Sequence, residues 1–271
     1  MENHRQILKK FEGDGFYIVK NIVKENQITD ILENVCRVYF RNNPSSKFLK
    51  EKKPCDNDLF HEEIIKFRDE NSNKFSEVYD SSQSSIPVIQ LVTSERISEI
   101  AAMLLRCKRI ELSQFGNMVR MDTPNDVRNK TAWHQEMQPA RNPGLVLWIP
   151  LVEFTDDIGL LRILEKSHLN GEIIIERNEI HDYTTSRVSK CGIPEKILEK
   201  YNEKVIKINR GDALFFDHML LHSSGDNTSK RIRLTCQLRF LNSVSNEFAA
   251  FRPSITYNPY AMKKLGRKIY D

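Results

Sequence analysis

The stretch Gly144–Val152 reads GLVLWIPLV, a short apolar run rich in residues that favour strands. Five other short runs are also rich in residues that favour strands. They are Ile110–Met121, Leu160–Leu164, Val205–Ile208, Ala213–Phe216 and Arg231–Leu241. Gly, Pro, Asn or Asp bounds each run, which is typical of an antiparallel sandwich or barrel. We therefore expect residues 108–245 to form a β core.

The residues before 108 follow a helical pattern instead. Apolar side chains recur about every 3.6 residues from Ile28 onward, which predicts a helix over 27–41. Similar patterns predict helices over 59–79 and 94–106, while 42–58 is expected to be a loop and Phe16–Val19 a short extended start. We expect residues 1–107 to be mostly helical and to pack outside the β core of a single domain spanning 1–271.

The composition is that of an ordinary soluble globular protein. The 271 residues include 41 Lys and Arg and 37 Asp and Glu, so the formal net charge is +4. These charges are interleaved rather than gathered in a basic stripe, so we expect no nucleic-acid partner, and the slight basic excess favours an anionic small-molecule substrate. No apolar stretch is long enough for a signal peptide or a membrane span, which predicts a cytoplasmic location and no membrane partner.

The cysteines are odd in number, widely scattered and never spaced as C-x-x-C. They are Cys36, Cys55, Cys107, Cys191 and Cys236. This pattern argues against a disulfide framework and against a structural zinc site.

A metal site is indicated by Trp133-His134-Gln135-Glu136, which follows a polar loop. If this segment is extended, His134 and Glu136 project from the same face and can converge on one ion. A second histidine, His222, comes after the strand-like run Gly211–Phe216. Two histidines and one carboxylate form the facial triad of non-haem iron oxygenases, although an isolated H-x-E is common by chance.

Arginines follow the second histidine across a turn rich in Gly, Asn and Ser. Arg233 lies eleven residues beyond His222, so a hairpin can return it beside the metal ligand. Its planar guanidinium would suit the far carboxylate of 2-oxoglutarate. Arg231 is a competitor, because it would project to the same face of a strand.

The other histidines receive plainer interpretations. His168 is expected to be a structural hydrogen-bonding residue, and His218 lacks the Ser and Asn sequel that follows His222. We expect His4, His61 and His181 to be solvated.

Taken in order, these segments resemble the phytanoyl-CoA dioxygenase-like (PhyH) family of iron(II)/2-oxoglutarate oxygenases. The resemblance begins at Phe11-Glu12-Gly13-Asp14-Gly15-Phe16 and continues through residues 133–136 and Leu147–Leu151. It then takes in the Gly211-Asp212 strand and the stretch from His222 to Arg233, so it covers nearly the whole chain. The fold it implies is a double-stranded β-helix, a jelly-roll or cupin-like barrel with N-terminal helices packed outside.

The resemblance implies roles for individual residues. It makes His134, Glu136 and His222 the iron ligands and Arg233 the partner of the 2-oxoglutarate carboxylate. The positions that match further co-substrate contacts are Ser224, Trp148 and Met118. The implied chemistry uses Fe(2+), 2-oxoglutarate and O2, releases succinate and CO2, and hydroxylates a substrate, although desaturation or ring closure would use the same oxidant.

Two positions depart from the family pattern. Glu136 stands where Asp is usual, which retains a carboxylate ligand with one more methylene. A carboxylate at this position also disfavours a halogenase. The stretch Leu164-Glu165-Lys166-Ser167-His168 replaces a common Pro-Gly-Ser-His, so the tight glycine turn is in question while Ser167 and His168 are kept.

The substrate is left open by the sequence. A metabolite carrying a carboxylate, phosphate or phosphonate is preferred, and its candidate cationic anchors are Arg120, Arg128, Arg141, Arg162 and Arg252. The polar stretch 171–203 is predicted to be an insertion that covers one mouth of the barrel as a lid. Two other classes remain open, a metal-dependent cupin-like isomerase or lyase and a non-catalytic barrel that binds a small ligand.

Overall fold

The computed structural model describes residues 3–83, 85–113, 118–126, 131–136, 144–173 and 193–245. Its helices are α1 (His4–Asp14), α2 (Glu25–Asn42), α3 (Asp58–Glu70), α4 (Ser72–Ser82), α5 (Ile86–Val92), α6 (Glu95–Leu104) and α7 (Glu195–Leu198), with 3-10 turns η1 (Pro54–Asp56) and η2 (Ser167–Asn170). Its strands are β1 (Phe16–Val19), β2 (Glu111–Leu112), β3 (Met118–Asp122), β4 (Gly144–Pro150), β5 (Leu161–Leu164), β6 (Glu203–Val205), β7 (Ala213–Asp217), β8 (His222–Ser224) and β9 (Arg233–Leu241). Over these residues no helix is both long and apolar enough to cross a membrane.

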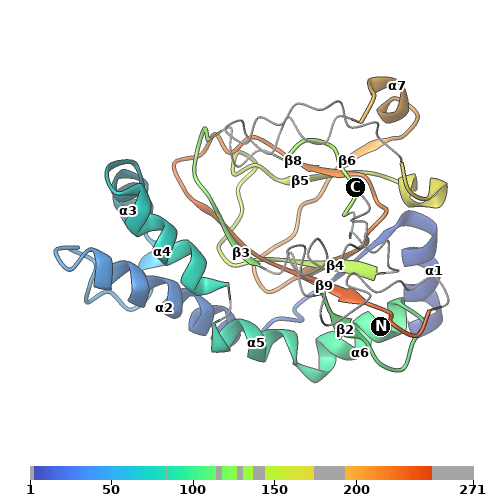
Figure 1. Cartoon of the computed structure of the whole chain (residues 1–271), viewed down its shortest axis with the longest axis horizontal. Coiled ribbons are helices and arrows are strands. Elements are labelled where there is room, and N and C mark those ends of the chain that lie inside the picture. Colours follow the sequence, from blue (N-terminus) through green and yellow to red (C-terminus); the bar gives the residue numbers. More distant parts are fainter. Residues whose placement is uncertain are drawn as a thin grey trace, which may run out of the picture.

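The strands form two sheets that face each other (Figure 1). The large sheet has the order β1-β7-β4-β9-β2, with β3 also paired to β9, and the small sheet has the order β6-β5-β8. All of these pairings are antiparallel. The expected mainly β jelly-roll fold with flanking helices is confirmed, but over the described residues the short strands do not hydrogen-bond into a closed barrel.

Strand β4 occupies the middle of the large sheet, and all of its residues are buried. Val146 and Trp148 belong to the apolar cluster between the two sheets, whereas Leu145 and Leu147 belong to the cluster under the helices. Because both faces of this strand are covered, its sequence is continuously apolar instead of alternating with polar residues.

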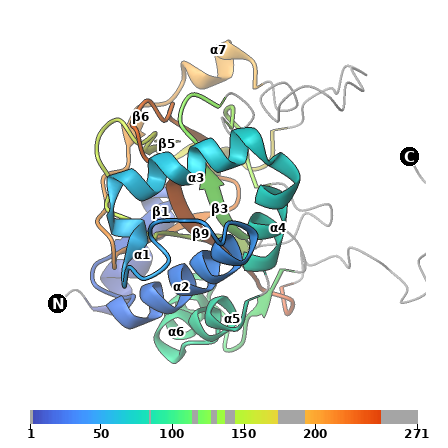
Figure 2. The same cartoon turned by 90° about the vertical axis from the view of Figure 1, so that its left-hand side faces the viewer.

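Helices cover the outer face of the large sheet, away from the small sheet (Figures 1 and 2). Residues of α2, α4, α5 and α6 share one core with the outward side chains of β3, β4 and β9. This agrees with the outer helical layer expected from residues 1–107, except that β1 from this part joins the large sheet beside β7.

The single helix predicted over 59–79 is wrong, because the chain forms α3 and α4 there. Asn71 separates them with φ −139° and ψ 56°, values outside the helical region. Helices α1 and α5 were not predicted, and the turn η1 falls inside the predicted loop over 42–58.

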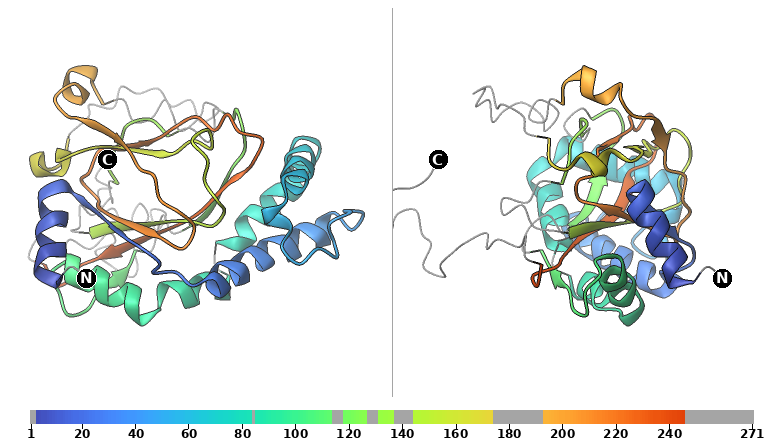
Figure 3. Two further views of the ribbon diagram at one scale, coloured as in Figure 1. Left: turned by 180° about the vertical axis from the view of Figure 1, so that it is seen from behind. Right: turned by 90° about the vertical axis from the view of Figure 1, so that its right-hand side faces the viewer.

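The turn at Lys166 adopts a left-handed backbone conformation without glycine. Lys166 has φ 64° and ψ 4°, the left-handed conformation that glycine adopts without a Cβ penalty. The Oγ atom of buried Ser167 then accepts a hydrogen bond from the Leu221 N–H, 2.8 Å away. His168 bonds through Nε2 to the Glu12 carbonyl at 3.0 Å, so η2 packs against the end of α1 (Figure 3).

The predicted lid over 171–203 falls only partly within the described residues. Residues 171–173 and 193–203 are described, and the latter contain α7 and the start of β6. Residues 174–192 lie outside the described part of the chain, so the role of this insertion stays a prediction.

Candidate metal centre

His134 and His222 lie side by side on two extended segments. Their backbones form an isolated antiparallel bridge, in which each N–H donates to the other's carbonyl over 3.0 Å. The ring centroids are 4.1 Å apart, and Phe216 packs against His222 with a centroid distance of 4.7 Å. The strand β8, which begins at His222, also pairs with β5, so the small sheet fixes this half of the site.

Hydrogen bonds orient both imidazoles in the same way. The Nδ1 atom of His134 lies 2.8 Å from the Ala132 carbonyl, and that of His222 lies 2.9 Å from the Leu220 carbonyl. A carbonyl oxygen can only accept, so each Nδ1 carries the proton and each Nε2 presents its lone pair. This is the tautomer that binds a metal through Nε2.

Glu136 brings a carboxylate to the two Nε2 atoms. Its Oε1 atom is 3.6 Å from Nε2 of His222 and 4.0 Å from Nε2 of His134. One ligand atom from each of these three residues lies within 4.8 Å of the others, the spacing of a group that can hold one metal ion. Sequence spacing thus predicted the residues that meet, including the extended geometry of the H-x-E segment.

The protonation states suit metal binding at neutral pH. Burial lowers the pKa of His134 to about 4, with the neighbouring His222 acting in the same direction, so the imidazole is neutral at pH 7. Burial acts to raise the pKa of Glu136, but the charges and hydrogen bonds of Arg239 and His222 together outweigh it and hold that pKa well below its usual range. His134 therefore offers a neutral nitrogen, and Glu136 a carboxylate, without prior loss of a proton.

Arg239 on β9 is a component of the site that the sequence interpretation missed. Its Nε lies 2.9 Å from Oε2 of Glu136, and its Nη2 donates to Oε1 at 2.5 Å, so the guanidinium grips both carboxylate oxygens. Arg239 is buried and lies six residues after Arg233 on the same strand, so both side chains leave β9 on one face. This even spacing from Arg233 is the feature of the sequence that could have indicated Arg239.

Arg233, the expected partner of 2-oxoglutarate, lies at the start of β9 and is buried. Its Nη2 and Nε atoms lie 2.7 and 3.1 Å from Oδ2 of Asp122, and Nη1 donates to the Gly159 carbonyl. Arg120 occupies the other oxygen of Asp122, with Nη2 2.9 Å from Oδ1. One carboxylate thus holds two buried arginines between the sheets.

Arg231, the competitor, points elsewhere. Its Nε lies 3.3 Å from Asp58 at the start of α3, and its Nη2 lies 3.4 Å from the Cys55 carbonyl in η1. The side chain is thus engaged with the helical layer rather than with Asp122.

The remaining predicted co-substrate residues lie on three different strands, one in the small sheet and two in the large sheet. Ser224 is buried on β8, two residues after His222, and its Oγ accepts a hydrogen bond from the Thr131 N–H at 2.7 Å. Trp148 is buried on β4 and packs edge-on against Phe154. Met118 begins β3 opposite Gln237, but its side chain is outside the described part of the structure.

Gln135, between the two ligands, faces the opposite way. Its Nε2 donates to the carbonyls of Gly171 (2.8 Å) and Met219 (2.6 Å), and its Oε1 accepts from the Ile173 N–H (2.8 Å). The amide therefore ties the ligand segment to residues 171–173. These bonds help to keep residues 134–136 extended.

Of the candidate substrate anchors, two are described. Arg120 lies between the sheets, whereas Arg162 pairs with Glu203 and stacks over the Trp133 ring at 4.9 Å. Arg128, Arg141 and Arg252 lie outside the described residues.

Comparison with known proteins identifies the family to which the chain is similar. The family model described as phytanoyl-CoA dioxygenase (PhyH) matches residues 11–235. The chain is 24% identical over 274 residues to an ectoine dioxygenase from Nocardia farcinica (strain IFM 10152), covering 94% of this chain and 85% of that protein.

Solved structures share the fold at low sequence identity. The nogalamycin-biosynthesis epimerase SnoN, in complex with Fe3+, alpha ketoglutarate and nogalamycin RO, has a TM-score of 0.60 at 17% identity, covering 94% of this chain and 92% of its own. EctD from S. alaskensis, with 2-oxoglutarate and 5-hydroxyectoine, has a TM-score of 0.58 at 16% identity, covering 93% of this chain and 82% of its own. AviO1 from Streptomyces viridochromogenes Tue57 has a TM-score of 0.55 at 14% identity, covering 92% of this chain and 99% of its own.

Proposed function

Because this chain belongs to the phytanoyl-CoA dioxygenase family, it is an iron(II)- and 2-oxoglutarate-dependent oxygenase, and we propose that it hydroxylates a small anionic metabolite, releasing succinate and carbon dioxide. The observation that carries the proposal is the convergence of two Nε2 lone pairs and the Glu136 carboxylate. Two imidazoles and one carboxylate fit iron(II) and leave coordination positions for a chelating keto acid and dioxygen. Bound iron supplies the chemistry that couples decarboxylation of 2-oxoglutarate to oxygenation of a C–H bond.

The side chains of the centre prepare it for the ion. His134 and His222 are locked in one tautomer by backbone carbonyls, so no ring has to turn when the metal binds. Arg239 keeps Glu136 ionised and oriented, with Oε1 directed toward both imidazoles. His222 is buried, and the side chains of His134 and Glu136 are only 18% and 16% exposed, so the access of bulk water to the ligands is restricted.

Arg233 and Ser224 are proposed to bind the far carboxylate of 2-oxoglutarate. Three contacts occupy one N–H on each guanidinium nitrogen of Arg233, and the guanidinium carries further N–H groups on Nη1 and Nη2. Gly159 packs against both Arg233 and Gly225, the residue after Ser224, so the guanidinium and the hydroxyl lie in the same part of the site. Trp148 is proposed to contact the same co-substrate. Met118 is proposed to do so as well, because of its position on β3.

An anionic substrate is supported by the charges between the sheets. Among the described residues, buried Arg120, Arg233 and Arg239 face Asp122 and Glu136, an excess of positive charge. Iron(II) and 2-oxoglutarate, with equal and opposite charges, would leave that excess in place. A carboxylate, phosphate or phosphonate on the substrate would neutralise it.

The metal and co-substrate assignment is tested by anaerobic titration. Fe(II) followed by 2-oxoglutarate should give a visible charge-transfer band in the wild-type protein. The band should be lost in His222→Ala and kept in His218→Ala, a matched change of the nearby histidine. A band that survives in His222→Ala would contradict the ligand set.

The co-substrate residue is tested by a second pair of variants. Arg233→Gln should raise the dissociation constant for 2-oxoglutarate on the metal-loaded protein roughly tenfold or more, because a charge-assisted pair is lost. Arg231→Gln should change it little. Calorimetry on both variants, with circular dichroism to verify folding, distinguishes the two arginines, and equal losses would reject the choice of Arg233.

The substrate class is tested by substrate-dependent succinate formation. Each carboxylate metabolite should be compared with its neutral amide, and the carboxylate should stimulate the reaction more strongly. Ectoine, which carries a carboxylate, is a sensible first compound because it figures in the names of a relative and of a solved structure. A consistent preference for amides would overturn the anionic class.

A further inference from the structure

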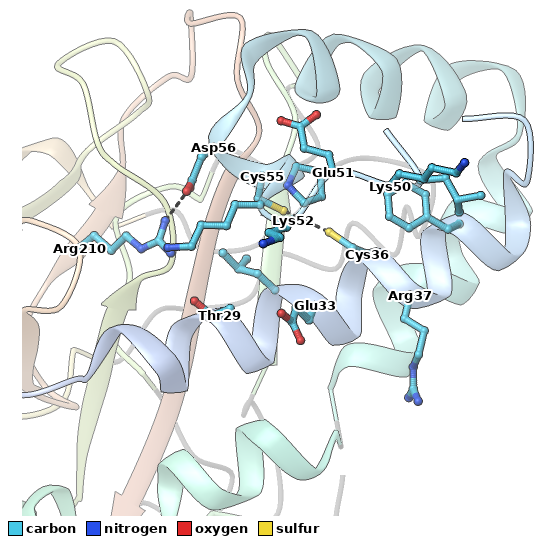
Figure 4. Close-up of a pocket in the computed structure, with 15 residues that line it drawn as sticks. Thr29, Glu33, Cys36, Arg37, Lys50, Glu51, Lys52, Cys55, Asp56 and Arg210 are labelled. Atoms are coloured by element: carbon cyan, nitrogen blue, oxygen red, sulfur yellow. Dashed lines mark hydrogen bonds and ion pairs between the residues drawn. The ribbon is translucent and has the colours of Figure 1, made fainter. Parts of the chain in front are cut away.

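Cys36 and Cys55 bring two thiols together in the helical layer, in a part of the fold that the proposed reaction does not use. Cys36 lies within α2 and Cys55 in η1, and their sulfur atoms are 3.4 Å apart (Figure 4). Both side chains are buried, with 5% and 3% of their surface exposed. The scattered spacing of the cysteines does not predict this pair.

A cavity gives access to the two sulfurs. Its volume is about 480 Å³, and it is lined by residues of α2, by residues 49–56, which lead into and include η1, and by Arg210. Cys36 and Cys55 form part of its wall, together with apolar side chains such as Leu32 and Phe40. Figure 4 shows both sulfurs directed toward each other, with lysines and acidic residues around them. A molecule as small as hydrogen peroxide fits easily into such a space.

We propose that Cys36 and Cys55 are an oxidisable pair that a small peroxide converts into a disulfide. A disulfide bond is about 2.05 Å long, so the sulfurs have to approach by roughly 1.4 Å, a change that two side chains can share. Cys36 is fixed in a long helix, whereas Cys55 belongs to a three-residue turn next to a polar loop. The turn is the part that can yield.

Contacts that do not involve sulfur hold the pair in place. The Cys55 carbonyl accepts hydrogen bonds from Nε2 of His61 at 2.8 Å and from Nη2 of Arg231 at 3.4 Å. Arg210 bonds to Asp56 in η1 at 2.7 Å and to Glu25 at the start of α2 at 2.8 Å. The two backbones should therefore stay adjacent when either thiol is changed to a hydroxyl.

The reaction balances with hydrogen peroxide as the oxidant. One thiol is oxidised by peroxide to a sulfenic acid, which releases one water. The second thiol attacks that sulfur and displaces a second water as the S–S bond forms. The sulfurs lose two electrons in total, and peroxide gains them.

The surroundings of Cys36 are expected to make its oxidation slow. The hydrogen bond with Cys55, and then burial, raise the pKa of the Cys36 thiol well above its ordinary value, so the thiolate is scarce at pH 7. Oxidation is therefore expected to accelerate as the pH rises.

The test is peptide mapping of full-length protein carrying Cys191→Ser, treated with hydrogen peroxide at pH 8. We expect a crosslinked pair of peptides containing residues 36 and 55, reversed by dithiothreitol. Cys107 and Cys236 serve as internal controls, because neither is paired with another described cysteine. The 36–55 pair should form an about tenfold larger share of all disulfide crosslinks in native protein than in urea, where any two cysteines must meet by random loop closure.

Two further observations decide the outcome. In Cys55→Ser, the sulfenic acid on Cys36 should persist and be trapped by dimedone, since no thiol is left to resolve it. The oxidised wild type should also melt at a higher temperature than the reduced form. Equal crosslinking in native and unfolded protein, or oxidation of Cys107 while residues 36 and 55 remain free thiols, would overturn the proposal.

Discussion

Arg239 is the buried countercharge of Glu136, and this pair determines how the centre responds to substitution. The guanidinium contacts both carboxylate oxygens, and Oε1 also faces the two imidazoles. A carboxylate with only 16% of its side chain exposed needs a neighbouring cation, which is either the arginine or a metal ion. Arg239 and a bound metal ion would therefore both stabilise the charge of the Glu136 carboxylate.

Arg239→Gln is expected to destabilise the metal-free protein by about 3 kcal/mol, because it leaves a buried charge unpaired. Added Mn(II), a substitute that resists air oxidation, should restore more stability in this variant than in the wild type. Thermal melts with and without Mn(II) measure both effects. The double variant Glu136→Gln/Arg239→Gln should be less damaged than Arg239→Gln alone, and equal damage would contradict the pairing.

His61 shows how tertiary contacts override a surface interpretation. The expectation that it is solvated is wrong, because only 1% of the residue is exposed. Its Nε2 donates to the Cys55 carbonyl, and its Nδ1 accepts from the Ile232 N–H at 3.1 Å. A second ring proton would break the bond to Ile232, and burial lowers the pKa of this histidine.

Stability should consequently fall as the pH drops below about 6.5, the ordinary histidine pKa, because the unfolded chain takes up a proton that the folded His61 resists. Urea unfolding at pH 7.5 and 5.5 measures the loss. In His61→Asn the drop between these two pH values should be smaller than in the wild type, whatever the variant's stability at pH 7.5. An unchanged pH dependence would exclude His61 as a source.

At the scale of elements, the sequence predicted helices and strands best where a single apolar pattern covered the whole element. The apolar run of β4 identified a strand, which the structure covers on both faces, and the period of Ile28, Ile31, Leu32 and Val35 identified α2. The break at Asn71 was missed because the residues on both sides continue the helical pattern. The Arg239–Glu136 pair was missed because 103 positions separate its members, and their meeting depends on which strands lie together.

The turn before η2 offers a test at this scale. Lys166 holds a left-handed backbone conformation, which costs a residue with a Cβ atom roughly 1–2 kcal/mol. Lys166→Gly should therefore stabilise the protein by up to about 1 kcal/mol once the greater freedom of glycine in the unfolded chain is counted. Lys66→Gly, within the exposed part of α3, should destabilise by about 1 kcal/mol. Chemical denaturation of the two variants should give opposite signs.

At the scale of the molecule, the metal centre connects the two sheets. His222 belongs to the small sheet, whereas Glu136 is gripped by Arg239 on β9 of the large sheet. An ion bound to these ligands links strands that do not hydrogen-bond to each other. Metal binding should therefore act on the whole fold.

Mn(II) at one hundred times its dissociation constant should stabilise the protein by about 2.7 kcal/mol, and a chelator should reverse the effect. Calorimetric melts across a metal titration measure this shift. His222→Ala should melt at a temperature independent of Mn(II). A metal-dependent shift in that variant would show that the ion binds elsewhere.

The amide of Gln135 has a consequence for how such an enzyme can diversify. It hydrogen-bonds to residues 171–173 only through main-chain groups, the Gly171 carbonyl and the Ile173 N–H. Main-chain groups are present whatever side chains a mutation installs there. New substrate preferences could thus evolve in the adjoining stretch while the proposed iron ligands keep their positions.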